Sequence, residues 1–564
     1  MSRRAKIVST LGPSSDTVDK IEELIQAGIN IARINMSHGT HEGHERVIKN
    51  IRQASLNTGY EIGILCDLQG PKIRVDKLTE NLILKAGEEW VIAPLEVKDK
   101  YPQYANRFIP TVYKNLVKDA HEGAIILFDD GLMEAKATKK EGDVLIIEIV
   151  IGGTLKSNKG INLPNVKVSA PSFTEKDRED LIFGLKQNVD YVALSFVREA
   201  KDILEVKYLL HGLKKNLPII SKIEKPEAIE NIEEIVDVSD CIMIARGDMG
   251  VEIGNHLVPG VQKDIIELCN RKGVPVITAT QMLESMTSNA RPTRAEANDV
   301  ANAIWDGTDA VMLSGETASG DYPVEAVTMM SNIILEAEKK PKERPLLRHM
   351  DLTNISSSLQ VAASLIAEKV SARWVLSVTQ SGNSCLQMSR FRSQKRILGV
   401  TNSIGVMRKM ALYWGITPFY FEEDEEGIEA IHYQMIDVLK EKKLVQNGDK
   451  IVITHGDGKY FTHGTSNSLR VEHIKDIPRE HDESQPGSKF QEVDIKGGRI
   501  ILDTTICGSC QNCVSVCPHG IWKLSDDDQR NTMINEKVAH NCSKDMECVE
   551  SCPTGAIEIL TTDQ

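Results

Sequence analysis

The chain has 564 residues, of which 41% are apolar and 26% are charged, and its formal net charge is -14 at pH 7. This length exceeds what one hydrophobic core supports, so about three or four domains are expected. The negative charge argues against nucleic acid or an anionic membrane as a general partner. Because the N-terminal segment has no secretory apolar stretch and no apolar run approaches a membrane span, we expect a cytoplasmic protein without a membrane partner.

Eight short apolar runs dominate the first 345 residues. They lie at residues 5–10, 30–36, 62–68, 191–196, 218–224, 241–246, 274–280 and 310–315. Intervening segments have helical signatures, among them a capping-box pair at Thr293 and Glu296. Eight buried strands alternating with helices predict an α/β fold of the (β/α)8 type, a TIM barrel, whose catalytic groups lie where strands end. We predict that residues 1–71 and 171–345 form this barrel.

The rest of the chain divides into four parts by pattern. Residues 72–170 carry short β patterns and turn signals with little helical periodicity, which predicts an inserted β-barrel domain. Strands and helices alternate again in residues 346–474, which predicts an open α/β regulatory domain. Residues 475–497 are charged and contain Pro, Gly and Ser without periodicity, so we predict a linker. A cysteine-rich module follows at 498–564.

Three charged residues follow the fifth and sixth predicted strands. Lys222 and Glu224 stand two positions apart, so they point to the same side of the strand, and Asp248 follows the neighbouring strand. Single charges at strand ends are usually solvated surface groups. Three that converge at the ends of consecutive strands instead predict a cradle for a divalent metal carrying a phosphorylated ligand.

Longer motifs around these residues occur in one order along the chain. They are INMSHG at 34–39, DLQGPKIR at 67–74, ISKIE at 220–224, ARGDMG at 245–250, ATQMLESM at 279–286 and LSGETASGDYP at 313–323. Over about residues 1–474 the sequence resembles pyruvate kinase, in that family's order and with its inserted β domain. The resemblance implies transfer of the phosphoryl group of phosphoenolpyruvate to ADP, in a homotetramer whose inserted domain acts as a lid.

The resemblance also implies roles for individual residues. Glu224 and Asp248 would hold Mg2+, and Lys222 would lie against the transferred phosphoryl group and the developing enolate oxygen. The phosphates would be bound by Arg33 and Arg74, and the nucleotide would contact residues Asn35 to His38, with Ser37 among them, and Lys159. The substrate carboxylate would be held by Gly247 and Asp248 N–H groups and the Thr280 hydroxyl. A proton relay would use Ser314, with Glu316 supporting it and Arg246 orienting the site.

The third strand departs from the family pattern. Many family members carry Thr, Lys, Glu and Thr where this chain has Leu68, Gln69, Lys72 and Val75. The family's monovalent-cation site lies there, and its matching residues are Asn35, Ser37, Asp67 and Leu68. Since Leu68 offers only its carbonyl and Lys72 brings an ammonium in place of an acid, we predict that Lys72 does the electrostatic work of K+ and that activity is largely independent of K+.

A polar loop in the α/β domain predicts an effector site. Hydroxyl and N–H groups between a strand and a helix can form an anion nest, and the loop consists of Thr379, Gln380, Ser381, Gly382, Asn383 and Ser384. In the resembled family this loop binds the phosphate of an allosteric effector. Residues 464–467 would supply the second half, and both a sugar phosphate and AMP remain open. The alternative is ordinary turn chemistry.

Seven of the eleven cysteines lie between residues 507 and 552. The run CxxCxxCxxxCP resembles two-cluster ferredoxins, in which the fourth cysteine ligates the other cluster, and the resemblance covers about residues 498–564 as a βαββαβ module. Cluster one would use Cys507, Cys510, Cys513 and Cys552. Cluster two would use Cys517, Cys542, Cys548 and Asp545. Because a carboxylate binds iron more weakly than a thiolate does, we predict that cluster two interconverts between [4Fe-4S] and [3Fe-4S].

The cysteine spacing has two alternatives to a redox module. A zinc ribbon fits seven thiolates in this spacing poorly, since zinc takes four ligands in tetrahedral pairs. A structural cluster without electron transfer stays open. The four other cysteines, Cys66, Cys241, Cys269 and Cys385, stand singly in apolar contexts and are predicted to be buried.

Two classes of function follow from these patterns. The first is a pyruvate kinase with an appended iron-sulfur module, which would give redox control or dock a redox partner protein. The second is an electron-transfer or redox-sensing protein on a degenerate barrel, which should have lost charges at 222, 224 or 248. The chain has lost none of them. A lyase barrel acting on phosphoenolpyruvate or oxoacids would share the metal carboxylates but lack the inserted domain and the α/β domain.

Overall fold

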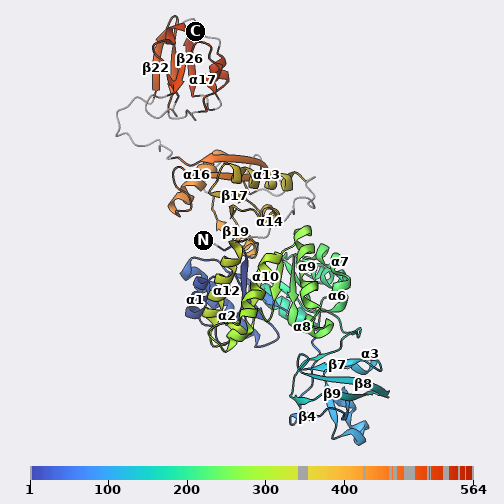
Figure 1. Cartoon of the computed structure of the whole chain (residues 1–564). Helices are drawn as coiled ribbons and strands as arrows, with labels where there is room; N and C mark the ends of the chain where they lie inside the picture. The colour runs from blue at the N-terminus through green and yellow to red at the C-terminus, as the bar shows by residue number, and fades with distance from the viewer. Residues whose placement is uncertain are drawn as a thin grey trace. The chain divides into compact units, whose positions relative to one another are not determined.

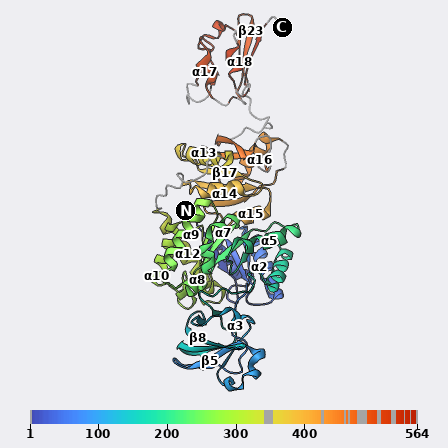
Figure 2. The same ribbon diagram turned by 90° about the vertical axis from the view of Figure 1, so that its right-hand side faces the viewer.

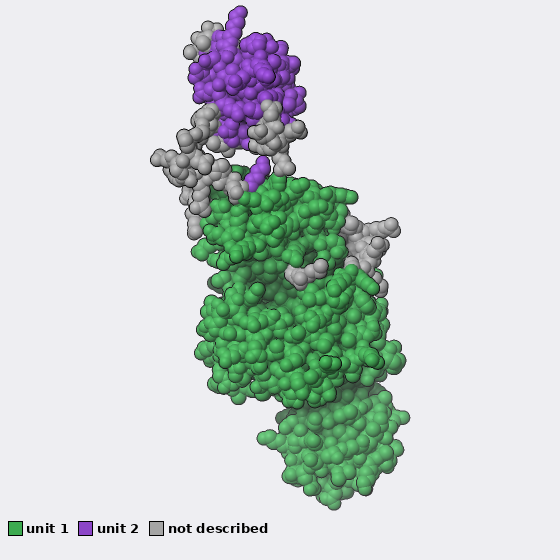
Figure 3. Space-filling view, turned by 60° about the vertical axis from the view of Figure 1, so that its left-hand side comes forward, with its two compact units in different colours: residues 1–474 green, residues 475–564 purple. Residues whose placement is uncertain are grey.

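The structure of the chain is a computed structural model. It describes residues 3–340, 354–423, 427–456, 460–461, 466–475, 490–504, 507, 510–524, 532–543, 546–552, 554 and 556–561. The chain forms two compact units, residues 1–474 and 475–564, which Figure 3 shows in different colours. The boundaries predicted at residues 72, 171 and 346 remain predictions, because the parts that they separate form one unit.

Eight parallel strands close into a barrel, which confirms the predicted fold class. They are β1 (Lys6–Thr10), β2 (Ile31–Asn35), β3 (Gly63–Asp67), β12 (Tyr191–Leu194), β13 (Ile219–Ile223), β14 (Cys241–Ala245), β15 (Val276–Ala279) and β16 (Ala310–Leu313). Each strand pairs with the next in this order, and β16 pairs with β1. All eight strands are buried almost throughout, as expected for strands enclosed by helices.

Helices surround the strands (Figure 1, Figure 2). They are α1 (Val18–Ala27), α2 (His41–Thr58), α4 (Glu175–Lys186), α5 (Ala200–Gly212), α6 (Pro226–Glu230), α7 (Ile232–Val238), α8 (Arg246–Ile253), α9 (Val258–Lys272), α10 (Arg294–Asp306), α11 (Gly315–Ala318) and α12 (Pro323–Glu338), with η3 (Glu284–Thr287). Thr293 and Glu296 form the predicted capping box at the start of α10.

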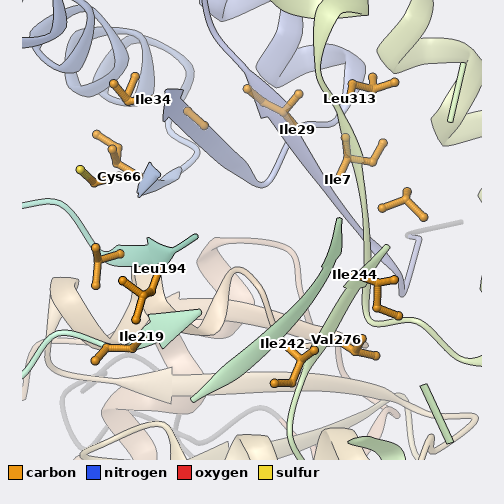
Figure 4. Packing of buried hydrophobic residues seen from close by; sticks show 14 of the residues in the cluster. Ile7, Ile29, Ile34, Cys66, Leu194, Ile219, Ile242, Ile244, Val276 and Leu313 are labelled. Atoms are coloured by element: carbon orange, nitrogen blue, oxygen red, sulfur yellow. The ribbon is translucent and has the colours of Figure 1, made fainter. Parts of the chain in front are cut away.

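Alternation along the strands determines which side chains reach the barrel interior. Ile219 and Ile223 of β13 pack in the large cluster that also contains helix residues, and Figure 4 shows Ile219 among its neighbours in that cluster. Ile220 instead belongs to a second cluster with inward residues of the other strands. Since Lys222 and Glu224 share the parity of Ile220, they point to the inside of the barrel.

The inserted part is almost entirely β structure. Its main sheet has the order β11-β7-β8-β9-β5-β6, with a short pair formed by β4 and β10. The bounds are β4 (Leu82–Leu84), β5 (Glu89–Pro94), β6 (Phe108–Thr111), β7 (Ile125–Phe128), β8 (Met133–Glu141), β9 (Val144–Ile151), β10 (Gly153–Leu155) and β11 (Ile161–Asn162), with α3 (Leu116–Asp119), η1 (Leu95–Lys100) and η2 (Pro102–Tyr104). Its own apolar cluster supports this sheet.

The following α/β part has a five-stranded sheet in the order β19-β18-β17-β20-β21, in which only β21 is antiparallel. The strands are β17 (Trp374–Val378), β18 (Arg396–Thr401), β19 (Ile416–Tyr420), β20 (Lys450–Gly456) and β21 (Ser466–His473), and the helices are α13 (Ile355–Lys369), α14 (Asn383–Arg390), α15 (Ile404–Met410) and α16 (Ile428–Glu441). Among the described residues of the whole chain, no helix is long and apolar enough to cross a membrane.

The second unit has the predicted βαββαβ order. Its elements are β23 (Gly498–Asp503), α17 (Asn512–Val516), β24 (Trp522–Leu524), β25 (Thr532–Ile534), η5 (Ala539–Asn541), α18 (Glu547–Glu550) and β26 (Ile557–Thr561). The predicted linker at 475–497 is wrong at its C-terminal end, because β22 (Phe490–Ile495) pairs antiparallel with β23. The charged residues of this segment are compatible with a strand, because Glu492 and Asp494 form ion pairs with Arg499 while Ile495 is buried in the apolar cluster of the unit. Residues 476–489 lie outside the described part of the chain.

Candidate active site

Lys222 lies at the centre of a charged group at the carboxyl end of the barrel strands. Its side chain is 12% exposed, and its Nζ lies 3.0 Å from Glu224 Oε1 and 3.4 Å from Asp67 Oδ1. It donates a hydrogen bond to Ser195 Oγ at 2.7 Å. Although burial opposes it, the two carboxylates raise the pKa of Lys222, so the ammonium stays charged.

Asp67 joins Lys222 to Arg33. Arg33 Nε donates to Asp67 Oδ2 at 2.7 Å, and Arg33 Nη1 donates to Thr10 Oγ1 at 2.9 Å. Burial would raise the pKa of Asp67, but Lys222 and Arg33 outweigh it and hold that pKa below its usual value. The site therefore contains a fixed alternation of charges in a nearly dry environment, which strengthens each electrostatic interaction.

Ser195 is a member of this group that the sequence did not single out. Besides accepting from Lys222, its hydroxyl donates to the Leu68 carbonyl at 2.7 Å. The available signal was its place directly after β12, where a hydroxyl interrupts an apolar run. The following residue, Phe196, has a φ of 53° and donates its N–H to Glu224 Oε2 at 2.7 Å.

The two predicted metal ligands fit a divalent cation. Glu224 is 1% exposed, and its buried Oε1 accepts no hydrogen bond from the described residues, although Lys222 Nζ lies 3.0 Å away. Burial raises the pKa of Glu224, Asp248 adds to this effect and Lys222 opposes it. A hard cation such as Mg2+ prefers carboxylate oxygens of this kind. Lys72 Nζ lies 3.7 Å from Asp248 Oδ1, so the residue that departs from the family pattern contacts this carboxylate.

The residues predicted to hold the substrate carboxylate lie close together after β14 and β15. Thr280 follows β15 with a φ of 67°, and its hydroxyl accepts the Gly247 N–H at 2.8 Å. Arg246 donates to the carbonyls of Ala279, Thr280 and Gln281 and pairs with Asp299 at 2.7 Å. The guanidinium thus ties the start of α8 to the loop after β15, which keeps the Gly247 N–H and the Thr280 hydroxyl together.

Ser314 and Glu316 lie after the last barrel strand. The Ser314 Oγ is buried and has no hydrogen-bond partner in the described chain. Glu316 is fully buried and accepts the N–H groups of Ser314 at 2.7 Å and Leu283 at 3.1 Å. Glu316 therefore orients the backbone at Ser314 and leaves its hydroxyl available.

The predicted nucleotide-binding residues are in part engaged with other protein groups. Asn35 Oδ1 accepts the Ser37 N–H at 3.1 Å, and Lys159 pairs with Asp129 at 2.8 Å. Arg74 donates to the Asn158 carbonyl at 3.2 Å.

The pKa of His38 is lowered by its surroundings. Burial first, and then the cations Arg74, Lys72 and Arg33, lower its pKa. Cations from β2 and from the segment that enters the inserted domain thus converge near His38.

The predicted effector loop lines a cavity of about 510 Å³ in the α/β part. Gly382, with a φ of 85°, donates its N–H to Thr379 Oγ1 at 3.0 Å, and Asn383 donates its N–H to Ser381 Oγ at 3.4 Å. The hydroxyls of Ser384 and Ser466 hydrogen-bond at 2.7 Å across the cavity lining. Gly464 and Thr465, part of the predicted second half, lie outside the described residues.

The cysteines of the second unit lie around its small core. Cys513 and Cys548 are buried, and Cys517, Cys542 and Cys548 line one cavity with His519. Cys507, Cys517, Cys542 and Cys552 pack against the same apolar cluster, and Cys510 is exposed. Asp545 lies outside the described residues. Cys517 thus reaches the cysteines of the second half, as the exchange of ligands between two clusters requires.

Within the described ranges, no three cysteine, histidine, aspartate or glutamate side chains meet closely enough to surround one metal ion. The four scattered cysteines are buried, as predicted.

The barrel and its site define a class: a (β/α)8 enzyme with a charged, metal-compatible site at the carboxyl end of its strands. Family models match three segments of the chain. The model for the pyruvate kinase barrel domain matches residues 2–327, that for the pyruvate kinase alpha/beta domain matches residues 357–472, and that for a 4Fe-4S dicluster domain matches residues 506–557.

Pyruvate kinases from three bacteria are similar to most of the chain. That of Staphylococcus saprophyticus is 43% identical over 483 residues, or 84% of this chain and 81% of that protein. That of Staphylococcus epidermidis is 42% identical over 510 residues (89% and 85%), and that of Geobacillus stearothermophilus is 43% identical over 488 residues (85% and 81%). The chain belongs to the pyruvate kinase family, and it carries a C-terminal 4Fe-4S dicluster domain. Both predicted resemblances are confirmed.

Proposed function

We propose that the chain transfers the phosphoryl group of phosphoenolpyruvate to ADP and releases pyruvate and ATP. The observation that carries the proposal is the position of Lys222 between two carboxylates, with Arg33 bound to one of them. Lys222 places a fixed positive charge where the transferred group and the enolate oxygen carry negative charge. Because three partners already hold Nζ, little reorganisation accompanies the reaction.

The neighbouring residues bind the metal ion and the two substrates. Glu224 and Asp248 would hold Mg2+, which when bound neutralises phosphate oxygens. Arg33 and Arg74 bind phosphates, and Lys159 with residues 35–38 contacts the nucleotide. The N–H groups of Gly247 and Asp248 and the Thr280 hydroxyl hold the substrate carboxylate.

The enolate needs a proton at carbon after phosphoryl transfer. Ser314, whose hydroxyl is buried and unpartnered among the described residues, passes that proton on through water. Glu316 keeps Ser314 in place by accepting its N–H. A Ser314→Ala variant should therefore slow ketonisation more than phosphoryl transfer.

Pyruvate formation from phosphoenolpyruvate and ADP tests the proposal directly. We expect turnover that depends on both substrates and on a divalent cation, and a Glu224→Gln variant that needs a higher Mg2+ concentration. Absence of turnover in the folded, metal-supplemented wild-type protein would leave the second class, an electron-transfer or redox-sensing protein on this scaffold.

Two features support activity without K+, although the family implies use of Mg2+ and K+. Lys72 supplies an ammonium beside Asp248, and three of the four predicted K+ ligand residues already have protein partners, at the Leu68 carbonyl, Asn35 Oδ1 and the Asp67 carboxylate. We expect little change in rate when K+ is added to a buffer free of sodium and potassium, and a Lys72→Glu variant that becomes K+-dependent. A wild-type enzyme that is inactive until K+ is added would contradict this proposal.

The iron-sulfur module supports a redox or regulatory role. Cluster one would be [4Fe-4S], and cluster two would be [4Fe-4S] or [3Fe-4S] with Asp545 as the weak ligand. Measuring ATP formation with clusters intact, reduced and removed tests the role, and visible absorbance with EPR identifies the clusters. Equal rates and effector responses in all three states would rule out regulation and leave a structural role or the docking of a redox partner.

We also propose an effector site and a homotetrameric assembly. The hydroxyl-rich loop at residues 379–384 supports a phosphorylated effector, either a sugar phosphate or AMP, and the family supports a homotetramer. The rate is measured against the concentration of each effector, in wild type and in a Ser384→Ala variant. These curves show whether the sugar phosphate, AMP or neither activates the enzyme. Sedimentation measures the assembly.

A further inference from the structure

A second cavity in the first unit has a strongly basic lining. It has a volume of about 230 Å³, well above the roughly 10–15 Å³ that one water needs. Its charged lining residues are Arg3, Arg4, Lys339, Lys395, Arg396 and Glu338. We call it the basic cavity. Five cations and one carboxylate give the lining of this cavity a net positive charge, whereas the whole chain has a net charge of -14. The positive electrostatic potential is therefore local to the cavity.

The basic cavity lies where the barrel meets the α/β part. Arg3 and Arg4 precede β1, and Lys339 follows α12, while Lys395 and Arg396 lie at the start of β18. Direct bonds join the two sides: Arg4 Nη2 donates to the Gln394 carbonyl at 2.8 Å, and the Gly415 N–H donates to the Arg4 carbonyl at 2.9 Å.

Among the residues that the structure describes, most of these cations have no carboxylate at ion-pair distance. Glu338 accepts the backbone N–H groups of Arg4 and Ala5 at 3.0 and 2.7 Å, and Lys339 pairs with Glu336. Within the described chain, no carboxylate lies at ion-pair distance from Lys395 or Arg396. Arg3 donates through Nη2 to the Gly28 carbonyl and to Asn30 Oδ1, yet its Nε and Nη1 are buried and donate no hydrogen bond to any described residue.

Buried donors without acceptors are costly, and guanidinium groups match phosphate oxygens well. Stacking helps to hold two of these groups in place, since Arg4 lies 5.6 Å from the centre of the Trp414 ring and Arg396 lies 5.7 Å from that of Trp374. We propose that the basic cavity binds the phosphate group of a small phosphorylated anion, at a site separate from the active site and from the loop at residues 379–384. The bound anion joins the barrel to the α/β part.

Calorimetric titration with inorganic phosphate tests the site, with and without Mg-ADP so that binding at the active site is separated. We expect a double variant, Lys395→Gln with Arg396→Gln, to bind phosphate at one site at least about tenfold more weakly than wild type. A matched control, Lys442→Gln with Lys443→Gln, makes the same charge change on two exposed lysines after α16 and should bind as wild type does. No step requires turnover, so the result is independent of the proposed activity.

A footprint on the wild-type chain gives a second measurement. Phosphate should lower the acetylation rate of Lys395 relative to that of Lys442. Equal phosphate affinity in wild type and the double variant, or an equal loss in the control, would overturn the proposal. Succinate serves as a dicarboxylate probe, and binding as tight as that of phosphate would overturn the assignment of the ligand class.

Discussion

The barrel site and the cysteine module organise their functional groups in opposite ways. In the barrel, Lys222, Asp67, Glu224 and Arg33 are partnered by one another and by Ser195, on strands that a large apolar core supports. In the module, cysteines pack against a small core between short elements. The barrel therefore builds its site before any ligand binds, whereas the module depends on its clusters for stability, as small metal-binding domains do.

Removal of iron should separate the two regions most clearly. We expect the unfolding transition of the module to disappear when the clusters are removed under reducing conditions, because the metal supplies much of its folding free energy. The transition of residues 1–474 should stay within about 1 °C. Calorimetry of the full chain measures both, and a module transition that survives without iron would contradict the comparison.

Replacing Lys222 tests whether the charged residues of the barrel site are already arranged for the reaction. A Lys222→Gln variant should lose about a thousandfold in turnover, since a fixed charge at the transition state is removed. It should also unfold more easily, because Asp67 and Glu224 lose their shared cation. Lys263→Gln, which breaks a surface ion pair with Asp306, serves as the control and should keep wild-type turnover. A Lys222→Gln variant with more than a tenth of wild-type activity would show that the ammonium is not central.

Lys6 is an exception to charge pairing within the barrel. It is buried, its Nζ donates to the Ile416 carbonyl at 2.6 Å, and burial, followed by Arg3, lowers its pKa to about 7 despite Glu338. Since its folded-state pKa lies below its unfolded value, the unfolded chain binds more protons between those two values, and stability rises with pH there.

Between pH 7 and 9 the free energy of unfolding of wild type should therefore rise by about 2 kcal/mol relative to a Lys6→Met variant. Denaturant titrations at the two pH values measure this difference. A parallel pH dependence in the two proteins would show that Lys6 is charged in both states.

Ser195 provides the smallest test. A Ser195→Ala variant removes one hydrogen bond to Lys222 and one to the Leu68 carbonyl, and we expect a roughly tenfold loss of turnover. Because the hydroxyl positions Lys222, the Mg2+ concentration for half-maximal activity should stay unchanged while the turnover number falls. A Ser195→Thr variant, which keeps the hydroxyl, should recover part of the rate. A changed Mg2+ requirement would place Ser195 at the metal instead.

Local sequence patterns predicted much of the fold and the site, because both depend on the periodic spacing of apolar and charged residues along short segments. Eight apolar runs and the spacing of Lys222 and Glu224 predicted the barrel and an inward pair, since side-chain direction alternates along any strand. The same alternation holds in β22, where Glu492 and Asp494 alternate with Val493 and Ile495, although the charge content of this segment is typical of a linker.

Sequence alone indicated the family, the barrel, the inward-pointing pair Lys222 and Glu224 and the cysteine spacing, because each depends on short patterns in the chain. Tertiary structure alone decided which partners those residues have: Ser195 with Lys222, Lys72 with Asp248, and Cys517 with the cysteines of the second half. It also assembled the basic cavity from segments near residues 3, 339 and 395. Contacts between segments so far apart arise from the packing of the folded chain, and no local pattern encodes them.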